Sequence, residues 1–94
     1  MLSIEKAGEN ELKFTGRFDA SQAEYATQEL AHIRETIVID ISELEYISSI
    51  GLGVLARTFK RLEENGHTIK LKNPNNHVKD VFKFTKLDQV LEII

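Results

Sequence analysis

Thr36-Ile37-Val38-Ile39-Asp40-Ile41 is the stretch that decides the fold of this chain. Almost every residue in it is apolar or β-branched, which is the pattern of a β-strand covered on both faces. Strands of this kind lie in the middle of a sheet that has helices packed against it. The stretch therefore predicts the central strand of an α/β domain.

A β-hairpin is expected on the amino-terminal side of this strand. Leu2 and Ile4, and then Leu12 and Phe14, alternate with polar neighbours on either side of the turn Gly8-Glu9-Asn10. Alternation with a period of two is typical of strands, and a short turn containing glycine joins two such strands into an antiparallel pair. The hairpin predicts an antiparallel edge for the sheet.

Three helices are expected from apolar residues that recur at steps of three and four. The first follows the candidate N-caps Asp19 and Ser21, the second runs from Gly51 to a stop at Asn65-Gly66, and the third follows the break at 73–76. Their apolar stripes are Ala23, Ala26, Leu30 and Ile33; Leu52, Leu55, Ala56, Phe59 and Leu62; and Val78, Val81 and Phe82.

Short strands at 68–71 and 90–94 complete the order β-β-α-β-α-β-α-β. Alternation of this kind favours helices packed on a largely parallel sheet. We therefore predict one α/β domain over residues 1–94, with a mixed, mostly parallel sheet of about four to five strands.

The charge balance and the amino-acid composition limit the classes of partner. Twelve Lys and Arg residues against 15 Asp and Glu residues leave a net charge of −3, which argues against a general nucleic-acid binder. Because there are no cysteines, disulfides, thiolate metal sites and cysteine nucleophiles are excluded. On the second helix Arg57, Lys60, Arg61 and the pair Glu63-Glu64 are expected to form a solvated face with i,i+4 pairing.

The amino terminus and the hydropathy pattern bear on the compartment. Residues 1–6 contain neither a basic leader nor the apolar run of a signal peptide. No window approaches the ~20 apolar residues of a membrane span. We expect a cytoplasmic protein that does not insert into a membrane.

The segment Tyr46-Ile47-Ser48-Ser49-Ile50-Gly51-Leu52-Gly53 joins the central strand to the second helix. In open α/β sheets, ligands and partners bind at this carboxyl edge. The amino end of a helix has unpaired N–H groups and roughly half a positive charge, and it can hold a phosphate. A serine hydroxyl here is either a purely structural N-cap or the acceptor of a regulatory phosphate. The two glycines let another protein approach the backbone closely.

Enzymatic readings of this segment find little support. The elbow of serine hydrolases is G-x-S-x-G, and Ile47 stands where its leading glycine would fall. A small enzyme with Ser48 or Ser49 as nucleophile would need a base nearby, and the segment contains none. The three separated histidines, His32, His67 and His77, show no metal-ligand spacing. We expect no catalysis, no metal and no cofactor.

Three motifs in register resemble the STAS domain of bacterial anti-sigma factor antagonists: GRFDA at 16–20, VIDIS at 38–42 and YISSIGLGVL at 46–55. The similarity extends over nearly the whole chain. It implies a partner-switching protein, which binds an anti-sigma factor that is also a serine kinase and so frees the sigma factor. Phosphorylation by that kinase ends the binding, and a phosphatase, of the PP2C type, restores it.

The chain departs from the family pattern at the phosphorylated position. The family's loop is commonly Asp-Ser-Ser/Thr-Gly, but here Ile50 precedes Gly51 and Ser48 takes the place of the aspartate. Either Ser49 or Ser48 carries the phosphate in a shifted register, with Ser49 favoured as nearer the helix, or the switch is lost and binding is constitutive or controlled by other means. Asp19 matches the acidic residue that the family places beside this loop.

The resemblance also implies which residues meet the partner, with Ile50 exposed for contact and Leu52 in the core. The alternative function is an accessory subunit of a transporter or of a lipid-handling ATPase complex, which needs no phosphoserine. The expected partner-binding residues are Asp19, Ser48, Ser49, Ile50, Gly51 and Gly53.

Overall fold

Strands and helices alternate along the chain in the predicted order. The computed structural model describes residues 1–94. The strands are β1 (Leu2–Gly8), β2 (Glu11–Phe18), β3 (Ile37–Ile47), β4 (Ile69–Lys72) and β5 (Glu92–Ile93), and the α-helices are α1 (Ala23–Leu30), α2 (Ser49–Glu63) and α3 (Asn76–Phe84). Two short 3-10 helices, η1 (Ala20–Gln22) and η2 (Leu87–Gln89), precede α1 and β5.

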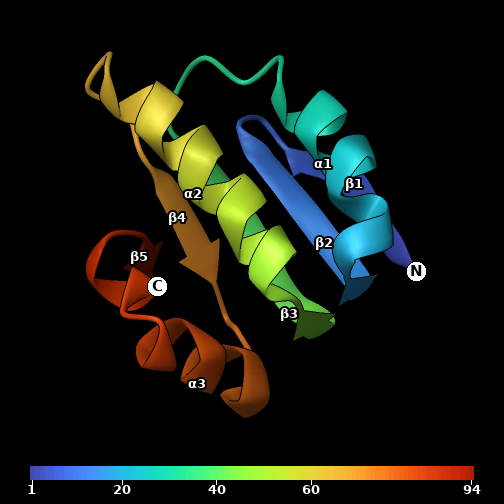
Figure 1. Ribbon diagram of the computed structural model, residues 1–94. Helices are drawn as coiled ribbons and strands as arrows, with labels where there is room; N and C mark the ends of the chain where they lie inside the picture. Colours follow the sequence, from blue (N-terminus) through green and yellow to red (C-terminus); the bar gives the residue numbers. More distant parts are fainter.

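The five strands form one mixed sheet in the order β1-β2-β3-β4-β5, so that β3 is central as predicted (Figure 1). β1 is antiparallel to β2, and the other three pairings are parallel. Asn10 closes the hairpin with a φ of 59°, in the left-handed region that asparagine tolerates in turns. One extra residue of β1 interrupts its pairing between Lys6 and Gly8. The antiparallel edge is therefore confirmed.

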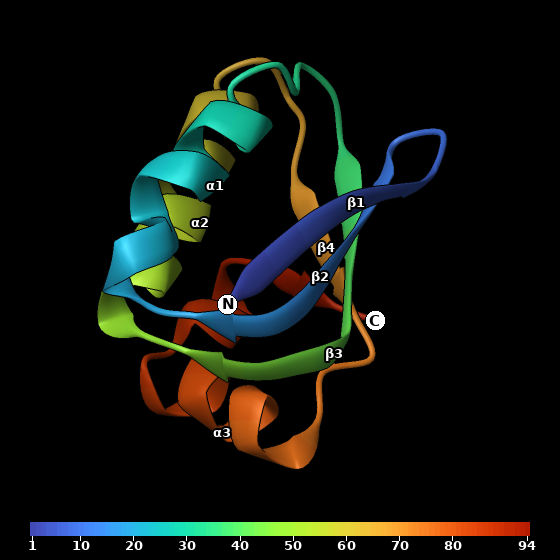
Figure 2. The same cartoon turned by 90° about the vertical axis from the view of Figure 1, so that its right-hand side faces the viewer.

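The helices cover the faces of the sheet unequally. Figure 2 shows α1 and α2 together on one side, with α3 below the sheet. In β3, Ile37, Ile39 and Ile41 face the helices and are buried. Val38 and Asp40 face the other way and are only half-buried, because no helix covers that side of the strand. The expectation of a strand covered on both faces was therefore wrong.

The open face of the sheet carries a charge ladder, which we define as Glu5, Lys13, Asp40 and Lys72. The strand register places these residues side by side, with the sign of the charge alternating from β1 to β4. Opposite charges that face each other across strands stabilise a sheet. Lys13 also forms an ion pair with Glu43, whose hydrogen bond and charge raise the pKa of Lys13.

Arg61 joins the end of α1 to α2. Its Nη1 donates to the carbonyl of Ile33 at 2.7 Å and its Nη2 to the carbonyl of Leu30 at 2.8 Å. The expectation that Arg61 belongs to a solvated helix face was therefore wrong. The expected i,i+4 ion pairs on α2 are also not formed, and the two ion pairs of the structure both join residues of the sheet. α1 also ends at Leu30, so Ile33 packs on the core from the following loop.

Side-chain caps set where α2 and α3 begin. α2 begins at Ser49, two residues before the predicted start, because Ser48 caps it. The side chain of Asn75 accepts a hydrogen bond from the Val78 N–H at 2.8 Å and so begins α3 as predicted. β5 has only 2 residues, because η2 occupies the chain just before it. No helix has the length and the apolar character needed to span a membrane.

β3 is regular in its first half and bulged in its second. Against β2, the register shifts between Lys13 and Thr15 and again between Gly16 and Arg17, each time by one extra residue of β3. Bulges bend a strand and re-aim its side chains, and they are frequent next to functional sites. The second bulge leaves Arg17 opposite Tyr46 where β2 and β3 end.

Candidate functional site

The turn from β3 into α2, residues 48–53, is closed by a serine cap, and we call it the serine bend. Ser48 is extended, with φ −83° and ψ 168°, and its Oγ accepts a hydrogen bond from the Gly51 N–H at 3.0 Å. Its carbonyl accepts from the Leu52 N–H at 2.9 Å. The cap pairs an amide that has no partner within the helix. Ser48 is therefore the N-cap of α2.

The end of β2 lies against the serine bend. The Ser48 N–H donates to the carbonyl of Phe18 at 2.9 Å, which places Asp19 beside the bend. Asp19 caps η1, with Oδ1 accepting from the Ser21 hydroxyl at 2.6 Å and from the Ser21 N–H at 3.0 Å. These two hydrogen bonds lower the pKa of Asp19, and the chain's N-terminal ammonium and Arg17 act in the same direction. A fixed negative charge therefore borders the bend at neutral pH.

The serine bend presents two neighbouring side chains to solvent. Ser49 is exposed, and its hydroxyl makes no hydrogen bond within the protein. Ile50 is 49% exposed, whereas Leu52 is only 5% exposed and belongs to the core. The prediction that Ile50 faces outward and Leu52 inward is confirmed.

The two glycines of the bend have different surroundings. A Cβ added to the buried Gly51 would lie 3.0 Å from the Ile47 side chain and 3.1 Å from the Phe18 ring. The missing side chain at Gly51 therefore lets α2 pack closely on β2 and β3. At Gly53 an added Cβ would meet only Nη1 of Arg57, at 3.4 Å. Of the two, Gly53 is the position where a second molecule can approach the backbone.

An arginine stacked on a tyrosine borders the bend. The Arg17 guanidinium carbon lies 4.4 Å from the centre of the Tyr46 ring, within the range of a cation–π interaction. Arg17 is exposed and makes no ion pair. Sequence analysis missed this pair, because the bulge that brings the two residues opposite each other leaves no mark in the alternating pattern.

The chemistry available at the bend is recognition and modification of an exposed hydroxyl. No histidine is hydrogen-bonded to Ser48 or Ser49; the one histidine side-chain bond joins His67 to Thr36. No three His, Asp or Glu side chains lie close enough together to hold a metal ion. No histidine is therefore paired with either serine in the way that a Ser–His nucleophile requires.

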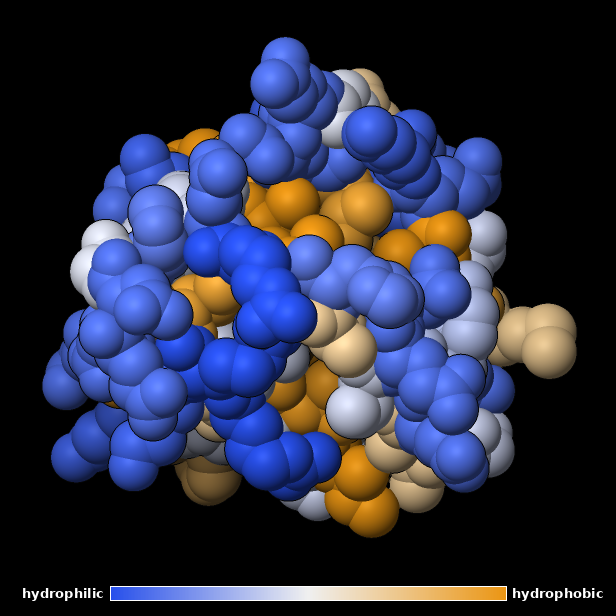
Figure 3. Space-filling view, turned by 90° about the horizontal axis from the view of Figure 1, so that it is seen from above, coloured by the Kyte–Doolittle hydropathy of each residue, from blue (hydrophilic) through white to orange (hydrophobic).

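A hollow of about 290 Å³ lies at the end of the sheet opposite the serine bend, next to the hairpin turn. Figure 3 views this end and shows apolar side chains between hydrophilic ones. Because its charged lining has both signs, the hollow favours no one class of charged ligand. Its lining residues are Lys6, Gly8, Glu9, Asn10, Glu11, Leu12, Ile33 and Ile37.

The STAS domain family model matches residues 3–94 of this sequence. The chain belongs to the STAS domain family. An anti-sigma-B factor antagonist of Bacillus subtilis (strain 168) is 28% identical over 93 residues, which cover 94% of this chain and 85% of that protein.

Solved structures share the same fold. The anti-sigma factor antagonist SpoIIAA in its unphosphorylated form superposes with a TM-score of 0.78 at 20% identity, over 100% of this chain and 88% of that one. The Bacillus cell fate determinant SpoIIAA in its phosphorylated form gives a TM-score of 0.72 at 19% identity, over 100% of this chain and 91% of that one. The expected α/β fold, a mixed five-stranded sheet with three α-helices, is therefore confirmed.

Proposed function

We propose that this STAS domain is an anti-sigma factor antagonist that works by partner switching. In its unphosphorylated state it binds an anti-sigma factor that is also a serine kinase, and this binding frees the sigma factor. Phosphorylation by the kinase ends the binding, and a PP2C-type phosphatase restores it. The domain is then a substrate and a binding module rather than an enzyme, and it acts in the cytoplasm, where sigma factors work.

One observation carries this proposal: an exposed hydroxyl and an exposed apolar side chain stand next to each other at the capped end of α2. Ser49 supplies the hydroxyl and Ile50 the apolar contact. Exposed side chains on a rigid turn are typical of recognition sites. The name of the Bacillus subtilis relative, an anti-sigma-B factor antagonist, supports the same function.

Ser49 is the better candidate for phosphorylation. The Ser48 Oγ already accepts the Gly51 N–H at 3.0 Å, and Ser48 is half-buried. Ser49 is exposed, and its hydroxyl has no partner within the protein. As the first residue of α2, it would hold a phosphate near unpaired amides and the positive end of the helix dipole.

A phosphate at Ser49 gives a physical reason for release of the partner. It adds about −1.5 to −2 charges at neutral pH. The new charge lies next to Ile50, on the surface that would be desolvated when the partner binds. It also lies on the side of the bend that Asp19 borders. Desolvation of the phosphate and repulsion between like charges both oppose binding.

The site of modification can be tested directly. The purified chain is incubated with its cognate anti-sigma kinase and ATP and then mapped by mass spectrometry. We expect phosphate on Ser49, loss of the signal in Ser49→Ala and its persistence in Ser48→Ala. If the chain binds the kinase but neither serine is modified, binding is constitutive and the phosphorylation step of the proposal is rejected.

The binding surface can be tested with a charge at Ile50. Because Ile50 lies outside the core, Ile50→Asp should weaken affinity for the anti-sigma factor by about 10-fold or more while changing the free energy of unfolding by less than about 0.5 kcal/mol. Val90, also exposed, lies outside the bend, and Val90→Asp is the matched control that should leave affinity unchanged. Equal affinities for the two variants would place the interface elsewhere.

An accessory role in a transporter or a lipid-handling ATPase complex is the second candidate. It is favoured by Ile50, which stands where the family pattern has the phosphorylated hydroxyl. Affinity purification from the native cell distinguishes the two functions, since one predicts a kinase-like anti-sigma factor as partner and the other an ATPase or a membrane transporter.

A further inference from the structure

A groove of about 210 Å³ lies between α1 and α2, separate from the serine bend. The two helices that border it lie side by side on one face of the sheet (Figure 1). Residues of both helices and the C-cap residue of α1 form its walls. They are Thr27, Ala31, Val54, Arg57, Thr58 and Arg61.

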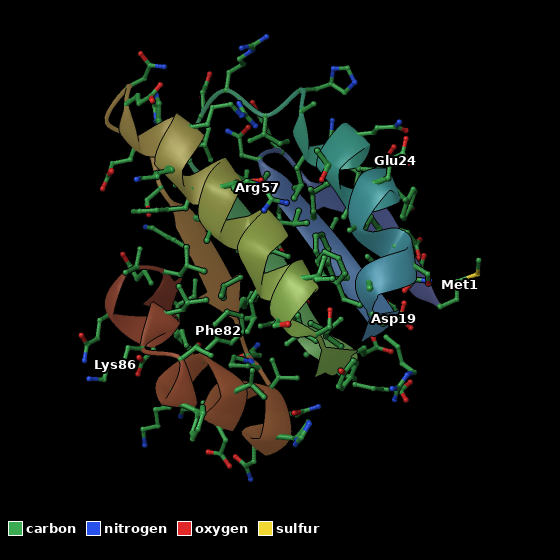
Figure 4. The ribbon with its side chains drawn as sticks, in the orientation of Figure 1. Met1, Asp19, Glu24, Arg57, Phe82 and Lys86 are labelled. Carbon is green, nitrogen blue, oxygen red and sulfur yellow. The ribbon has the colours of Figure 1, made fainter.

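The groove is positively charged in a chain that carries a net charge of −3. Its two charged residues are both arginines, and no carboxylate lines it. Arg61 is half-buried and held by its bonds to two carbonyls at the end of α1. Arg57 is exposed and has neither an ion pair nor a hydrogen bond. Figure 4 shows Arg57 reaching from α2 toward α1, with Glu24 on the outer side of α1.

The guanidinium groups supply the free hydrogen-bond donors of this groove. The hydroxyl of Thr27 already donates to the carbonyl of Ala23 at 2.8 Å, and that of Thr58 donates to the carbonyl of Val54 at 2.9 Å. A guanidinium presents its N–H groups as a flat fork that matches the two oxygens of a carboxylate or of a phosphate. The chemistry of the groove therefore selects an anionic oxygen group.

The serine bend and the free guanidinium of the groove lie on the same side of α2. Ile50, Gly53 and Arg57 follow each other at steps of three and four, which places them on the same helical face. Nη1 of Arg57 lies 3.4 Å from the position of a Cβ on Gly53, so the guanidinium reaches back toward the bend. A protein that covers Ile50 can thus extend over Gly53 to the free guanidinium.

We propose that this groove is an anion-binding site that receives a carboxylate side chain of the protein docked on the serine bend. The assignment of the occupant rests on the proposed function; the affinity for anions does not. The carboxylate pairs with Arg57, while Arg61 adds positive charge from a fixed position. Since the chain as a whole carries a net charge of −3, this local attraction also orients the partner.

The first experiment tests the groove alone, with inorganic phosphate as the probe. Backbone amides and arginine Nε groups of the labelled chain are followed by NMR as phosphate is added at constant ionic strength. We expect saturable shifts at Arg57, Thr58 and Thr27 that disappear in Arg57→Gln and persist in Lys60→Gln. Lys60 is an exposed cation of the same helix that does not line the groove. Shifts that are absent, or that are the same in both variants, overturn the proposal.

The second experiment tests the occupant, with the purified anti-sigma factor as the partner. Arg57→Gln should weaken binding by about 10-fold and flatten its dependence on salt, because a charge-assisted hydrogen bond is lost. Lys60→Gln should change affinity by less than about 2-fold, as expected of an exposed charge outside the contact. Equal losses in the two variants would reject the carboxylate contact.

The two experiments distinguish failure of the proposed function from failure of the proposed anion site. If phosphate titrates the groove but the wild-type chain does not bind the anti-sigma factor, the proposed function is wrong, the anion site stands and its assigned occupant is rejected. If the factor binds, Ile50→Asp abolishes binding and Arg57→Gln has no effect, the proposed function stands and the groove is not part of the interface.

Discussion

The first half of β3 pairs regularly with β2, whereas the second half is bulged. The comparison distinguishes the features that stabilise the fold from those that shape the serine bend. In the first half, Ile37, Ile39 and Ile41 are buried and the residues between them face the open side. In the second half two bulges interrupt the pairing with β2, and the strand runs into the serine bend. The regular half packs against the helices, and the irregular half leads the chain into the serine bend.

The largest effect is expected from breaking the regular half. Ile39 is fully buried, so Ile39→Ala should lower the free energy of unfolding by about 2–5 kcal/mol. Val38→Ala, on the half-buried face, is the control and should cost much less. Urea denaturation followed by circular dichroism measures both. Equal losses would show that the two faces of β3 contribute alike, against the one-sided core seen here.

The next largest effect tests how the irregular half of β3 and the end of β2 pack against α2. Gly51→Ala should destabilise the fold by about 1–3 kcal/mol, because its Cβ would press on Ile47 and Phe18 at close to 3 Å. Gly53→Ala should preserve or raise stability, since alanine favours a helix by up to about 1 kcal/mol over glycine. Thermal unfolding of the two variants would contradict the packing argument if their order were reversed.

A smaller effect sharpens the distinction between the two serines. Ser48→Ala removes the cap of α2 and should cost about 1 kcal/mol in the free energy of unfolding. Ser49→Ala removes a hydroxyl that has no partner and should stay within about 0.5 kcal/mol of the wild type. Chemical denaturation separates the two, and an equally large loss in Ser49→Ala would refute the assignment of Ser48 as the cap.

The smallest effect is the dependence of stability on pH. It involves Asp40, in the regular half of β3, and Asp19, beside the serine bend that follows the irregular half. Partial burial raises the pKa of Asp40. The hydrogen bonds from the N–H and hydroxyl of Ser42 and the charges of Lys13 and Lys72 lower it by more, so the pKa of Asp40 lies below its ordinary value. The pKa of Asp19 is also lowered. Since both folded-state values lie below the unfolded ones, their stabilisation is complete at neutral pH and is lost as the pH falls through them.

The pH effect is measured as the melting temperature from neutral to acidic pH. Asp40→Asn and Asp19→Asn should each be less stable than the wild type at neutral pH, and each should lose less stability on acidification. A wild type that gained stability on acidification, or variants with the same acid dependence as the wild type, would contradict the stated pKa shifts.

Periodic patterns predicted the fold because regular burial leaves a regular signal. The hairpin, the central strand and the stripes of the helices were all visible as repeats of two or of three and four residues. The one-sided cover of β3 was not, since Val38 is as apolar as a buried residue although it faces the open side. The bonds from Arg61 to carbonyls of the α1 end also left no trace, because backbone acceptors carry no side-chain signature.

The site was predictable where it depends on local chain order and unpredictable where it depends on distant contacts. The outward position of Ile50 and the inward position of Leu52 follow from helical spacing after a cap. The stacking of Arg17 on Tyr46 depends on a bulge, and the free guanidinium of Arg57 depends on the placement of α1 beside α2. Such features require the tertiary structure.

The two outer strands have a consequence for self-association. Unpaired backbone groups on an edge strand can pair with another chain and begin aggregation. β5 offers only 2 residues for such pairing, and β1 is interrupted between Lys6 and Gly8 and carries charge at Glu5 and Lys6. Extension of the sheet from one molecule to the next is therefore disfavoured at both edges. Association with other proteins then depends on side-chain surfaces rather than on pairing of open backbone.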